Sequence, residues 1–349
     1  MHGGNIYGNE IEYDFSVNLN PLGPPESVRD AMAAALNHVE EYPDPKYREL
    51  RRELANYWQL SEEQLVPGNG ASELIPGIIR ALAPKTCMVT APCYSGYETA
   101  LNAAAPFCRI HRIPLRAEND FTLPENICQE IARVKPNLLI LTNPNNPNGK
   151  RISANCLREI ADACRMAGTV LLMDECFLAL SGGDENSLIH CIRSEALPAV
   201  VLRAFTKTFA IPGVRLGYAV CSGFPAARIQ RELPEWNLSV FAQYAGTAAL
   251  EAATPKTSGY LAASVEMIAR EREYLTAELE KLGLRVFPSD ANYILFQSRD
   301  TGLHRKLLEK GILIRDCRDY HGLTAGFYRA AVRTRRENTM FLRCLRNIK

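Results

Sequence analysis

The sequence has almost no excess of charge of either sign. Lysine and arginine together number 40, and aspartate and glutamate number 39, so the formal net charge is +1. The sequence also lacks a run of basic residues, which is the usual signature of a protein that binds nucleic acid or a membrane surface. We therefore expect a small-molecule partner, with no nucleic acid and no membrane.

Long hydrophobic runs and metal-ligand spacings are also missing. No stretch approaches the roughly 18 uninterrupted apolar residues of a membrane span, and the N-terminus lacks the charged and apolar regions of a secretory signal. The 11 cysteines form no CxxC pair and no Cys/His spacing of a zinc site. Their odd number and scattered positions are typical of reduced core thiols. These absences predict a cytoplasmic protein without a metal site.

The length and the pattern of apolar residues predict two unequal lobes. A chain of 349 residues exceeds the size at which one hydrophobic core usually stops growing. Short apolar runs alternate with amphipathic segments, which favours an α/β fold with a mostly parallel sheet. The plainest predicted strands are 87–90, 138–141, 170–173 and 200–205.

The pattern changes near residue 255. Residues 259–283 read as one long helix, and strand-like ANYILF and GILIRD segments follow it. We predict an N-terminal arm over residues 1–40 that joins the small domain, a large domain over 41–255, and a small α+β domain over 256–349.

Four predicted strands end in residues that carry chemistry. Tyr94, the NPNNPNG stretch at 143–149, Asp174 and the Thr206-Lys207 pair each follow one of them. In open α/β sheets, ligands bind beyond the carboxyl ends of the strands. We therefore expect these side chains to meet at one site.

The strongest local signal runs from Thr206 to Gly217, where Lys207 leaves an apolar strand and Arg215 follows eight residues later. A lysine amine attacks carbonyl groups only when it is neutral, and partial desolvation at a strand end lowers its pKa. Arginine supplies a planar fork that suits a phosphate. A lone lysine is ordinarily a surface residue, but the apolar strand and the Pro-Gly turn argue against that interpretation.

This segment resembles the Schiff-base lysine region of the fold-type I, class I/II aminotransferases, especially the histidinol-phosphate aminotransferase branch. The resemblance implies the fold of the pyridoxal-phosphate-dependent transferases and a pyridoxal 5'-phosphate cofactor held by Lys207. Asn146 would bond the phenolic oxygen of the cofactor. Asp174 would pair with the protonated pyridine nitrogen and keep the ring an electron sink, although taken alone it also suits a helix N-cap.

The turn Gly68-Asn69-Gly70-Ala71-Ser72-Glu73 precedes an apolar, helix-like run. A glycine-rich turn that opens a helix offers free backbone N–H groups to a phosphate. Within the resemblance, this turn supplies the phosphate cup, whose members are Gly70, Ala71, Ser72, Thr206 and Arg215.

Two tyrosines complete the implied cofactor site. Tyr94 matches the aromatic residue that stacks on the pyridine ring. Tyr42 matches a tyrosine that reaches the cofactor phosphate from the neighbouring subunit, which implies a homodimer. Each also suits plain core packing with the hydroxyl at the surface.

A finer resemblance covers nearly the whole chain. The His2-Gly3-Gly4-Asn5 opening and the segments 14–23, 41–44, 174–177, 210–213 and 311–317 are similar to the threonine-phosphate decarboxylases of cobalamin synthesis. Arg329 would then bind the substrate α-carboxylate, and His2, Asn18 and Arg315 would surround the substrate phosphate. The implied substrate-binding residues are His2, Gly3, Asn18, Arg315 and Arg329. Arg333 is expected to be structural or a second anion contact.

The sequence departs from the aminotransferase pattern at two positions. Ala204 stands where a hydroxyl residue commonly bonds the cofactor phosphate, so one donor is missing. Phe177 stands where a tyrosine usually bonds the phenolic oxygen. The loss of that donor indicates chemistry other than ordinary transamination.

The resemblance therefore implies the decarboxylation of L-threonine O-3-phosphate, and three alternatives remain. A histidinol-phosphate-type aminotransferase would use the same lysine, aspartate and arginine. L-serine O-phosphate differs from the threonine substrate by one methyl group, worth about 1–3 kcal/mol in a hydrophobic pocket. A non-catalytic binding protein would have lost catalytic residues, yet the whole implied set is present: Lys207, Asp174, Asn146, Arg215 and Arg329.

Overall fold

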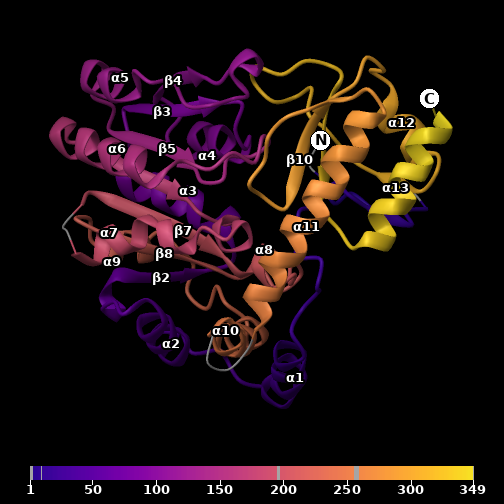
Figure 1. The fold of residues 1–349 in the computed structure, drawn as a ribbon. Coiled ribbons are helices and arrows are strands. Elements are labelled where there is room, and N and C mark those ends of the chain that lie inside the picture. The colour runs from indigo at the N-terminus through magenta and orange to yellow at the C-terminus, as the bar shows by residue number, and fades with distance from the viewer. Residues whose placement is uncertain (1–2, 9, 195–196, 255–258, 349) are drawn as a thin grey trace.

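The computed structural model describes residues 3–8, 10–194, 197–254 and 259–348. Its largest element is a seven-stranded sheet with the order β2-β8-β7-β6-β5-β3-β4 (Figure 1). Strands β3 to β7 run parallel, whereas β8 pairs antiparallel with both β7 and β2. This mostly parallel sheet confirms the predicted α/β fold.

The strands of this sheet are β2 (Leu65–Gly68), β3 (Thr86–Ala91), β4 (Arg109–Pro114), β5 (Leu138–Thr142), β6 (Val170–Asp174), β7 (Ala199–Ala204) and β8 (Gly217–Ser222). The four strands predicted from apolar runs correspond to β3, β5, β6 and β7. The fourth prediction ran one residue too far, because Phe205 opens the short helix α8 (Phe205–Thr208).

Helices cover both faces of the sheet because its strands are apolar on both sides. In β5, for example, Leu138 and Ile140 point to one face and Leu139 and Leu141 to the other, and all four are buried. One face packs against α3 (Ala71–Leu82), α4 (Gly96–Ala104) and α9 (Ala226–Gln230). The other packs against α2 (Arg48–Trp58), α5 (Ile127–Val134), α6 (Ala154–Ala167), α7 (Leu188–Ser194) and α10 (Val240–Ala253).

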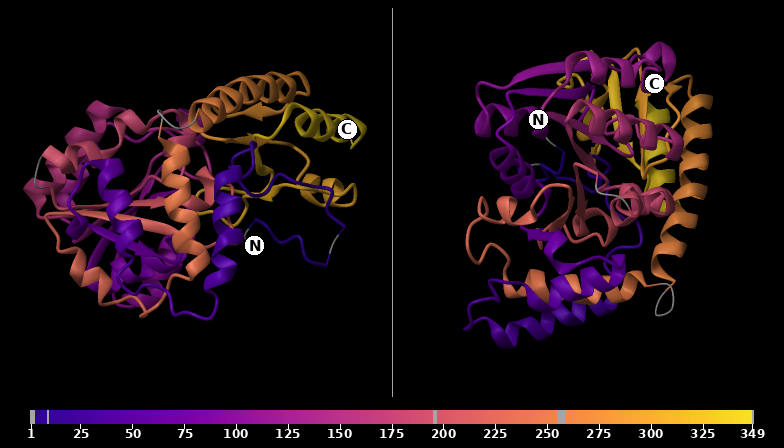
Figure 2. Two further views of the ribbon diagram at one scale, coloured as in Figure 1. Left: turned by 90° about the horizontal axis from the view of Figure 1, so that it is seen from below. Right: turned by 90° about the vertical axis from the view of Figure 1, so that its left-hand side faces the viewer.

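A second, antiparallel sheet lies toward the C-terminus. Its order is β12 (Arg315–Asp316), β13 (Phe327–Ala331), β10 (Tyr293–Gln297) and β9 (Arg285–Val286). Helices α11 (Tyr260–Lys281), α12 (Leu303–Leu308) and α13 (Arg335–Ile348) accompany it. Helix α11 is the long helix expected at 259–283, and the right-hand view of Figure 2 shows it along one side of the molecule.

The N-terminal segment contacts both parts of the molecule. Strand β1 (Tyr13–Asp14) pairs in parallel with β11 (Ile312–Leu313), close to the second sheet, whereas α1 (Glu26–Ala34) packs against α10. The predicted domain boundaries near residues 40 and 255 stay predictions. The remaining short helices are η1 (Ala35–His38), η2 (Glu62–Gln64), η3 (Ala117–Asn119), η4 (Leu178–Ser181) and η5 (Asp184–Asn186).

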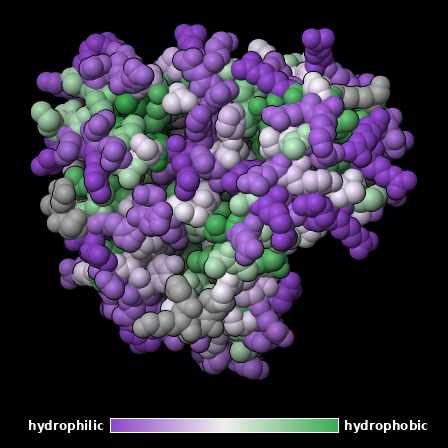
Figure 3. All heavy atoms as spheres, viewed as in Figure 1, coloured by the Kyte–Doolittle hydropathy of each residue, from purple (hydrophilic) through white to green (hydrophobic). Residues whose placement is uncertain are grey.

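Hydrophilic residues dominate the face shown in Figure 3, with smaller hydrophobic patches between them. Within the ranges described above, no helix combines the length and the apolar character that a membrane crossing requires. The same ranges hold no group of three or more His, Cys, Asp or Glu side chains arranged to bind a metal ion.

Candidate active site

A cavity of about 240 Å³ lies at the carboxyl ends of the parallel strands, where the large sheet faces the second lobe. Its lining comes from three parts of the chain: the large sheet with its loops, the second sheet near β12 and β13, and the N-terminal segment. The lining residues are Gly3, Ser16, Val17, Asn18, Ala71, Tyr94, Tyr97, Thr142, Asn146, Asp174, Cys176, Phe177, Ala204, Thr206, Lys207, Arg215, Arg315, Tyr320 and Arg329. The structure thus brings most of the residues selected from the sequence to one place.

Lys207 lies in α8, immediately after β7, and its side chain lines the cavity. Burial lowers the pKa of its amine to about 8, and the positive charges of Arg329 and Arg215 contribute to the lowering. A lysine with this pKa carries a substantial neutral fraction near neutral pH, and the neutral amine is the form that attacks a carbonyl carbon. The position of Lys207 therefore gives its amine the lowered pKa expected from the sequence, and its role as the cofactor lysine stays a prediction.

Asp174 is the last residue of β6 and is buried beside the cavity. The backbone N–H of Cys176 donates to its Oδ1 at 2.9 Å, and the hydroxyl of Tyr97 donates to its Oδ2 at 2.6 Å. These two hydrogen bonds fix the orientation of the carboxylate. Asp174 therefore presents an oriented carboxylate to a ligand in the cavity.

A cradle for an anion forms where α3 begins. Gly70 precedes the helix with φ of +76°, and a Cβ atom at this position would lie 2.9 Å from Nη2 of Arg215. That same Nη2 donates to the Ser72 hydroxyl at 2.6 Å. Glycine is therefore required here both for the backbone conformation and for the approach of the guanidinium. The first N–H groups of α3, Thr206 and Arg215 surround a place suited to a phosphate.

Two buried arginines lie on the side of the cavity that faces the second lobe. Arg329 donates from Nη1 to Asn146 Oδ1 at 2.6 Å and from Nη2 to the Ser16 carbonyl at 2.7 Å. Its buried Nε has no hydrogen-bond partner among the described residues. Arg315 is held by Asp319, with its Nη2 2.8 and 2.9 Å from the two carboxylate oxygens. Both guanidinium groups can receive an anionic substrate.

The two departures from the aminotransferase pattern also lie at the cavity. Ala204 is the last residue of β7, and its methyl side chain lines the cavity where the pattern has a hydroxyl group. Phe177 lines it as well, and its ring packs edge-on against Tyr293 with the centroids 5.1 Å apart. The structure thus places an apolar ring where the pattern leads one to expect a phenol.

Three of the selected residues that the structure describes do not line the cavity. Gly70 and Ser72 lie just behind it, in contact with Arg215. Tyr42 is 81% exposed and packs against Trp236, with the ring centroids 5.1 Å apart, so its predicted role across a subunit interface stays a prediction. His2 lies outside the described residues.

Arg333, expected to be structural or a second anion contact, is engaged within the protein. Its Nη2 donates to Glu337 at 2.6 Å and its Nη1 to the Asp14 carbonyl at 2.9 Å. It is absent from the cavity lining. These contacts favour the structural alternative.

Sequence reasoning did not assign a role to several residues that the fold brings to the cavity. They are Ser16, Tyr97, Thr142, Cys176 and Tyr320. Thr142 ends β5 and Tyr97 follows the selected Tyr94 by three residues. Their proximity to strand ends was the available signal, but only the structure shows their side-chain partners.

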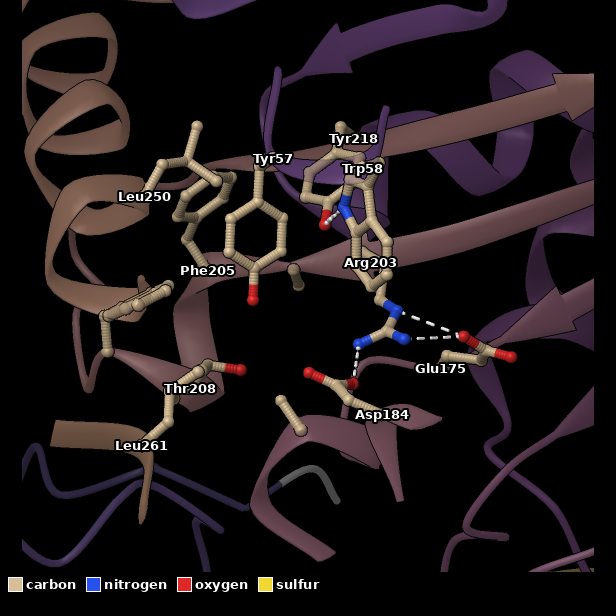
Figure 4. A pocket seen from close by; sticks show the side chains of 14 residues that line it. Tyr57, Trp58, Glu175, Asp184, Arg203, Phe205, Thr208, Tyr218, Leu250 and Leu261 are labelled. Carbon is tan, nitrogen blue, oxygen red and sulfur yellow. Dashed lines mark hydrogen bonds and ion pairs between the residues drawn. The ribbon is translucent and has the colours of Figure 1, made fainter. Parts of the chain in front are cut away.

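A buried ion-pair network lies next to the strand ends that carry Asp174 and Lys207. Glu175, the neighbour of Asp174, is paired with Arg203 of β7, with Oε2 and Nη2 2.8 Å apart. Arg203 also pairs with Asp184 at 2.6 Å and lies over the Trp58 ring. Figure 4 shows the guanidinium between the two carboxylates, beside a small cavity of about 40 Å³. This network joins β6 and β7 close to the site.

The site fits pyridoxal 5'-phosphate on three observations. A lysine of lowered pKa is available for a carbonyl group, a buried carboxylate is available for a cationic ring nitrogen, and the Gly70 cradle leaves room for a phosphate beside Arg215. The three groups line or adjoin one cavity, as a single bound molecule requires.

Comparisons with known proteins agree with this chemistry. A family model described as "Aminotransferase class I and II" matches residues 10–345. A threonine-phosphate decarboxylase from Salmonella typhimurium is 35% identical over 99% of this chain and 96% of its own length. A histidinol-phosphate aminotransferase from Archaeoglobus fulgidus is 32% identical over 96% of this chain and 92% of its own.

Solved structures give the same result for the fold. The crystal structure of the histidinol-phosphate aminotransferase from Clostridium acetobutylicum is 29% identical, with a TM-score of 0.86, over 96% of this chain and 98% of that one. Together with the match to the family model, these similarities establish that the chain is a pyridoxal-phosphate enzyme of the aminotransferase class I and II family.

Proposed function

We propose that the enzyme decarboxylates L-threonine O-3-phosphate to (R)-1-amino-2-propanol O-2-phosphate, a precursor in cobalamin (cobamide) biosynthesis. The observation that carries this proposal is the pair of buried guanidinium groups, Arg329 and Arg315, at one cavity that also holds Lys207. A substrate with a carboxylate and a phosphate supplies one anion for each. The 35% identical threonine-phosphate decarboxylase supports the same reaction.

Different residues would contact the carboxylate, the phosphate and the Cα atom of the substrate. Arg329 would bind the α-carboxylate through its free Nε and a neighbouring N–H, and Arg315, Asn18, His2 and Gly3 would hold the substrate phosphate. When bound, pyridoxal phosphate accepts the electron pair released as a bond to Cα breaks. After carbon dioxide leaves, the Lys207 amine would donate a proton to Cα.

Orientation decides between decarboxylation and transamination. Arg329 and Arg315 would fix the carboxylate and the phosphate of the substrate, and the orientation that they impose would select which bond to Cα breaks. The alternative, a histidinol-phosphate aminotransferase, has its own support in the 32% identical Archaeoglobus protein. Phe177 and the His2-Gly3-Gly4-Asn5 opening favour the decarboxylase.

Introducing a phenol at position 177 should shift the products. We expect Phe177→Tyr to raise the ratio of transamination to decarboxylation by about tenfold, since one hydrogen bond to a charged group is worth about 1.5–3 kcal/mol. The measurement is the ratio of 2-oxo acid to carbon dioxide formed from L-threonine O-3-phosphate. Phe205→Tyr, a change of the same chemistry at a buried position outside the cavity lining, serves as the control. A wild-type product ratio in Phe177→Tyr would contradict the weight we place on this position.

The lowered pKa of Lys207 sets the pH dependence of cofactor uptake. Only the neutral amine reacts, so the rate at which cofactor-free protein binds pyridoxal phosphate should rise with pH and reach half of its maximum near the pKa of about 8. Stopped-flow absorbance across a pH series measures this rate. A midpoint above about 10, the value of an exposed lysine, would contradict the environment described for Lys207.

We also propose a homodimer that functions in the cytoplasm. Tyr42, Leu36, Val39 and Trp236 are exposed apolar side chains, and a second copy of the chain would cover them and place Tyr42 near its cofactor phosphate. All 11 cysteines are free, which supports a reducing compartment.

The test is to incubate the cofactor-loaded enzyme with L-threonine O-3-phosphate and to measure carbon dioxide and aminopropanol phosphate. We expect both products, and L-serine O-phosphate tested in parallel shows how strictly the methyl group is required. If neither product forms, and the enzyme instead transfers the amino group of histidinol phosphate to 2-oxoglutarate, giving glutamate and the corresponding ketone phosphate, the decarboxylase proposal is wrong.

A further inference from the structure

The carboxylate of Asp174 is held by a chain of two hydroxyl groups that comes from neighbouring elements. Tyr97, in the first turn of α4, donates to Asp174 Oδ2 at 2.6 Å, and its hydroxyl lies 2.9 Å from Thr142 Oγ1 at the end of β5. All three side chains are buried. The contacts link residues that are 45 and 77 positions apart in the sequence.

The direction of these hydrogen bonds follows from counting protons. A phenol has one proton, and an ionised carboxylate can only accept, so the Tyr97 proton points to Asp174. Thr142 must then donate to the Tyr97 oxygen. The resulting order, from the Thr142 hydroxyl to the Tyr97 hydroxyl to Asp174 Oδ2, strengthens each bond by polarising the next.

Tyr97 remains a donor throughout the working pH range. Burial raises the pKa of its phenol well above the ordinary value, and the negative charge of Asp174 raises it further. Tyr97 also fixes the neighbourhood of the cavity in a second way, because its ring packs edge-on against Tyr94 with the centroids 5.4 Å apart.

We propose that Tyr97, supported by Thr142, is a positioning residue that holds the Asp174 carboxylate in the orientation in which it faces the ring nitrogen of the cofactor. This inference rests on the proposed function, in which Asp174 is the partner of that nitrogen. A buried tyrosine whose hydroxyl merely finds a partner in the core would look similar, so the experiment must separate positioning from packing.

The two interpretations differ in what they change. The bound cofactor would take up charge when a bond to Cα breaks, so the contact between Asp174 and its ring nitrogen would matter most in the transition state. A weaker contact should therefore lower kcat more than it raises KM. Without its proton, the ring nitrogen of the cofactor would carry no positive charge. The proton on the Lys207 nitrogen of the loaded enzyme would then be held more tightly, so the pKa of that nitrogen should rise. The pH midpoint of the visible absorbance change of the bound cofactor should therefore move upward.

The main variant is Tyr97→Phe, which removes the hydroxyl and leaves the ring. We expect an increase of about tenfold in the dissociation constant for pyridoxal phosphate, an upward shift of the absorbance midpoint, and a decrease of about tenfold in kcat with KM changed by less than about twofold. Thr142→Val should change the same three quantities in the same direction but less, because Tyr97 still donates to Asp174.

The chain offers two matched controls. Thr90→Val removes a buried hydroxyl near the end of β3 that has no hydrogen-bond partner among the described residues. Tyr218→Phe removes a buried phenol that accepts a hydrogen bond from Trp58 Nε1 at 2.8 Å, away from the catalytic cavity. Tyr218→Phe should lower stability without moving the absorbance midpoint, and Thr90→Val should leave both unchanged.

Asp174→Asn separates failure of the inference from failure of the proposed function. If Asp174→Asn shifts cofactor affinity and the absorbance midpoint while Tyr97→Phe does neither, Tyr97 is only a packing residue and our inference is wrong. If Asp174→Asn also has no effect, the assignment of Asp174 fails, and the inference fails with it. Should Tyr97→Phe not fold, the presence or absence of the Thr142→Val shift decides.

Discussion

Replacement of Lys207 by alanine should lower kcat for carbon dioxide release from L-threonine O-3-phosphate by about 10²- to 10⁴-fold, the usual worth of a positioned proton-transfer group. Lys207 is the amine at the cavity with a pKa lowered to about 8, which suits both attack on a carbonyl and return of a proton to Cα. Substrate binding should change less, because the proposed anion contacts come from Arg315 and Arg329. Steady-state kinetics with saturating cofactor separate kcat from KM.

Two further variants make this result specific. Lys207→Arg keeps the positive charge but offers no neutral amine at working pH, so it should be as inactive as Lys207→Ala. Lys306→Ala removes an exposed lysine that pairs with Asp300 and should leave kcat unchanged. An added small primary amine should restore part of the activity of Lys207→Ala, since it can occupy the space that the side chain leaves. Full activity of Lys207→Ala would remove Lys207 from the mechanism.

The fold and the position of the site follow from simple properties of the sequence. Parallel strands buried on both faces read as continuous apolar runs, so β3, β5, β6 and β7 were predictable to within a few residues. Because the carboxyl ends of parallel strands share one edge, Asp174 and Lys207 were expected to lie together. The cavity lining contains both.

The side-chain networks around the site were not predictable in the same way. The hydrogen bond between Tyr97 and Asp174 joins residues that are 77 positions apart. No periodic pattern in the sequence predicts a contact of this kind. The only hint for Arg203 was its place in an otherwise apolar strand, where a charged residue requires a buried partner. That partner is Glu175. In the sequence it is only one residue of the segment 174–177, which resembles the threonine-phosphate decarboxylases, and no role was predicted for it.

Replacement of Arg203 by methionine should produce the largest loss of stability among the changes considered, about 3–5 kcal/mol in the free energy of unfolding. Methionine keeps much of the volume, but Glu175 is left as an uncompensated charge whose side chain is completely buried. The Ser187 hydroxyl and the Leu188 N–H still donate to Glu175, but neither supplies a positive charge. Urea denaturation of the wild type and the variant measures the difference.

The pH dependence of this loss identifies its cause. Burial already raises the pKa of Glu175, and the loss of Arg203 should raise it further. A carboxyl group whose folded pKa lies above its unfolded value favours the folded state at low pH, and this advantage is lost as the pH rises through the folded pKa. The deficit of Arg203→Met relative to the wild type should therefore be smaller at about pH 5.5 than at about pH 7.5.

Two comparisons separate the buried pair from charge loss in general. Arg165→Met breaks an exposed ion pair with Asp162 and should cost at most about 1 kcal/mol. Arg203→Met combined with Glu175→Leu removes both buried charges and should recover most of the lost stability, because apolar replacement of a whole buried pair is often neutral. Asp184 loses its partner in both Arg203 variants, but its side chain is 32% exposed and can be hydrated. If the double variant were no more stable than Arg203→Met, the loss would come from packing against Trp58 rather than from the unpaired carboxylate.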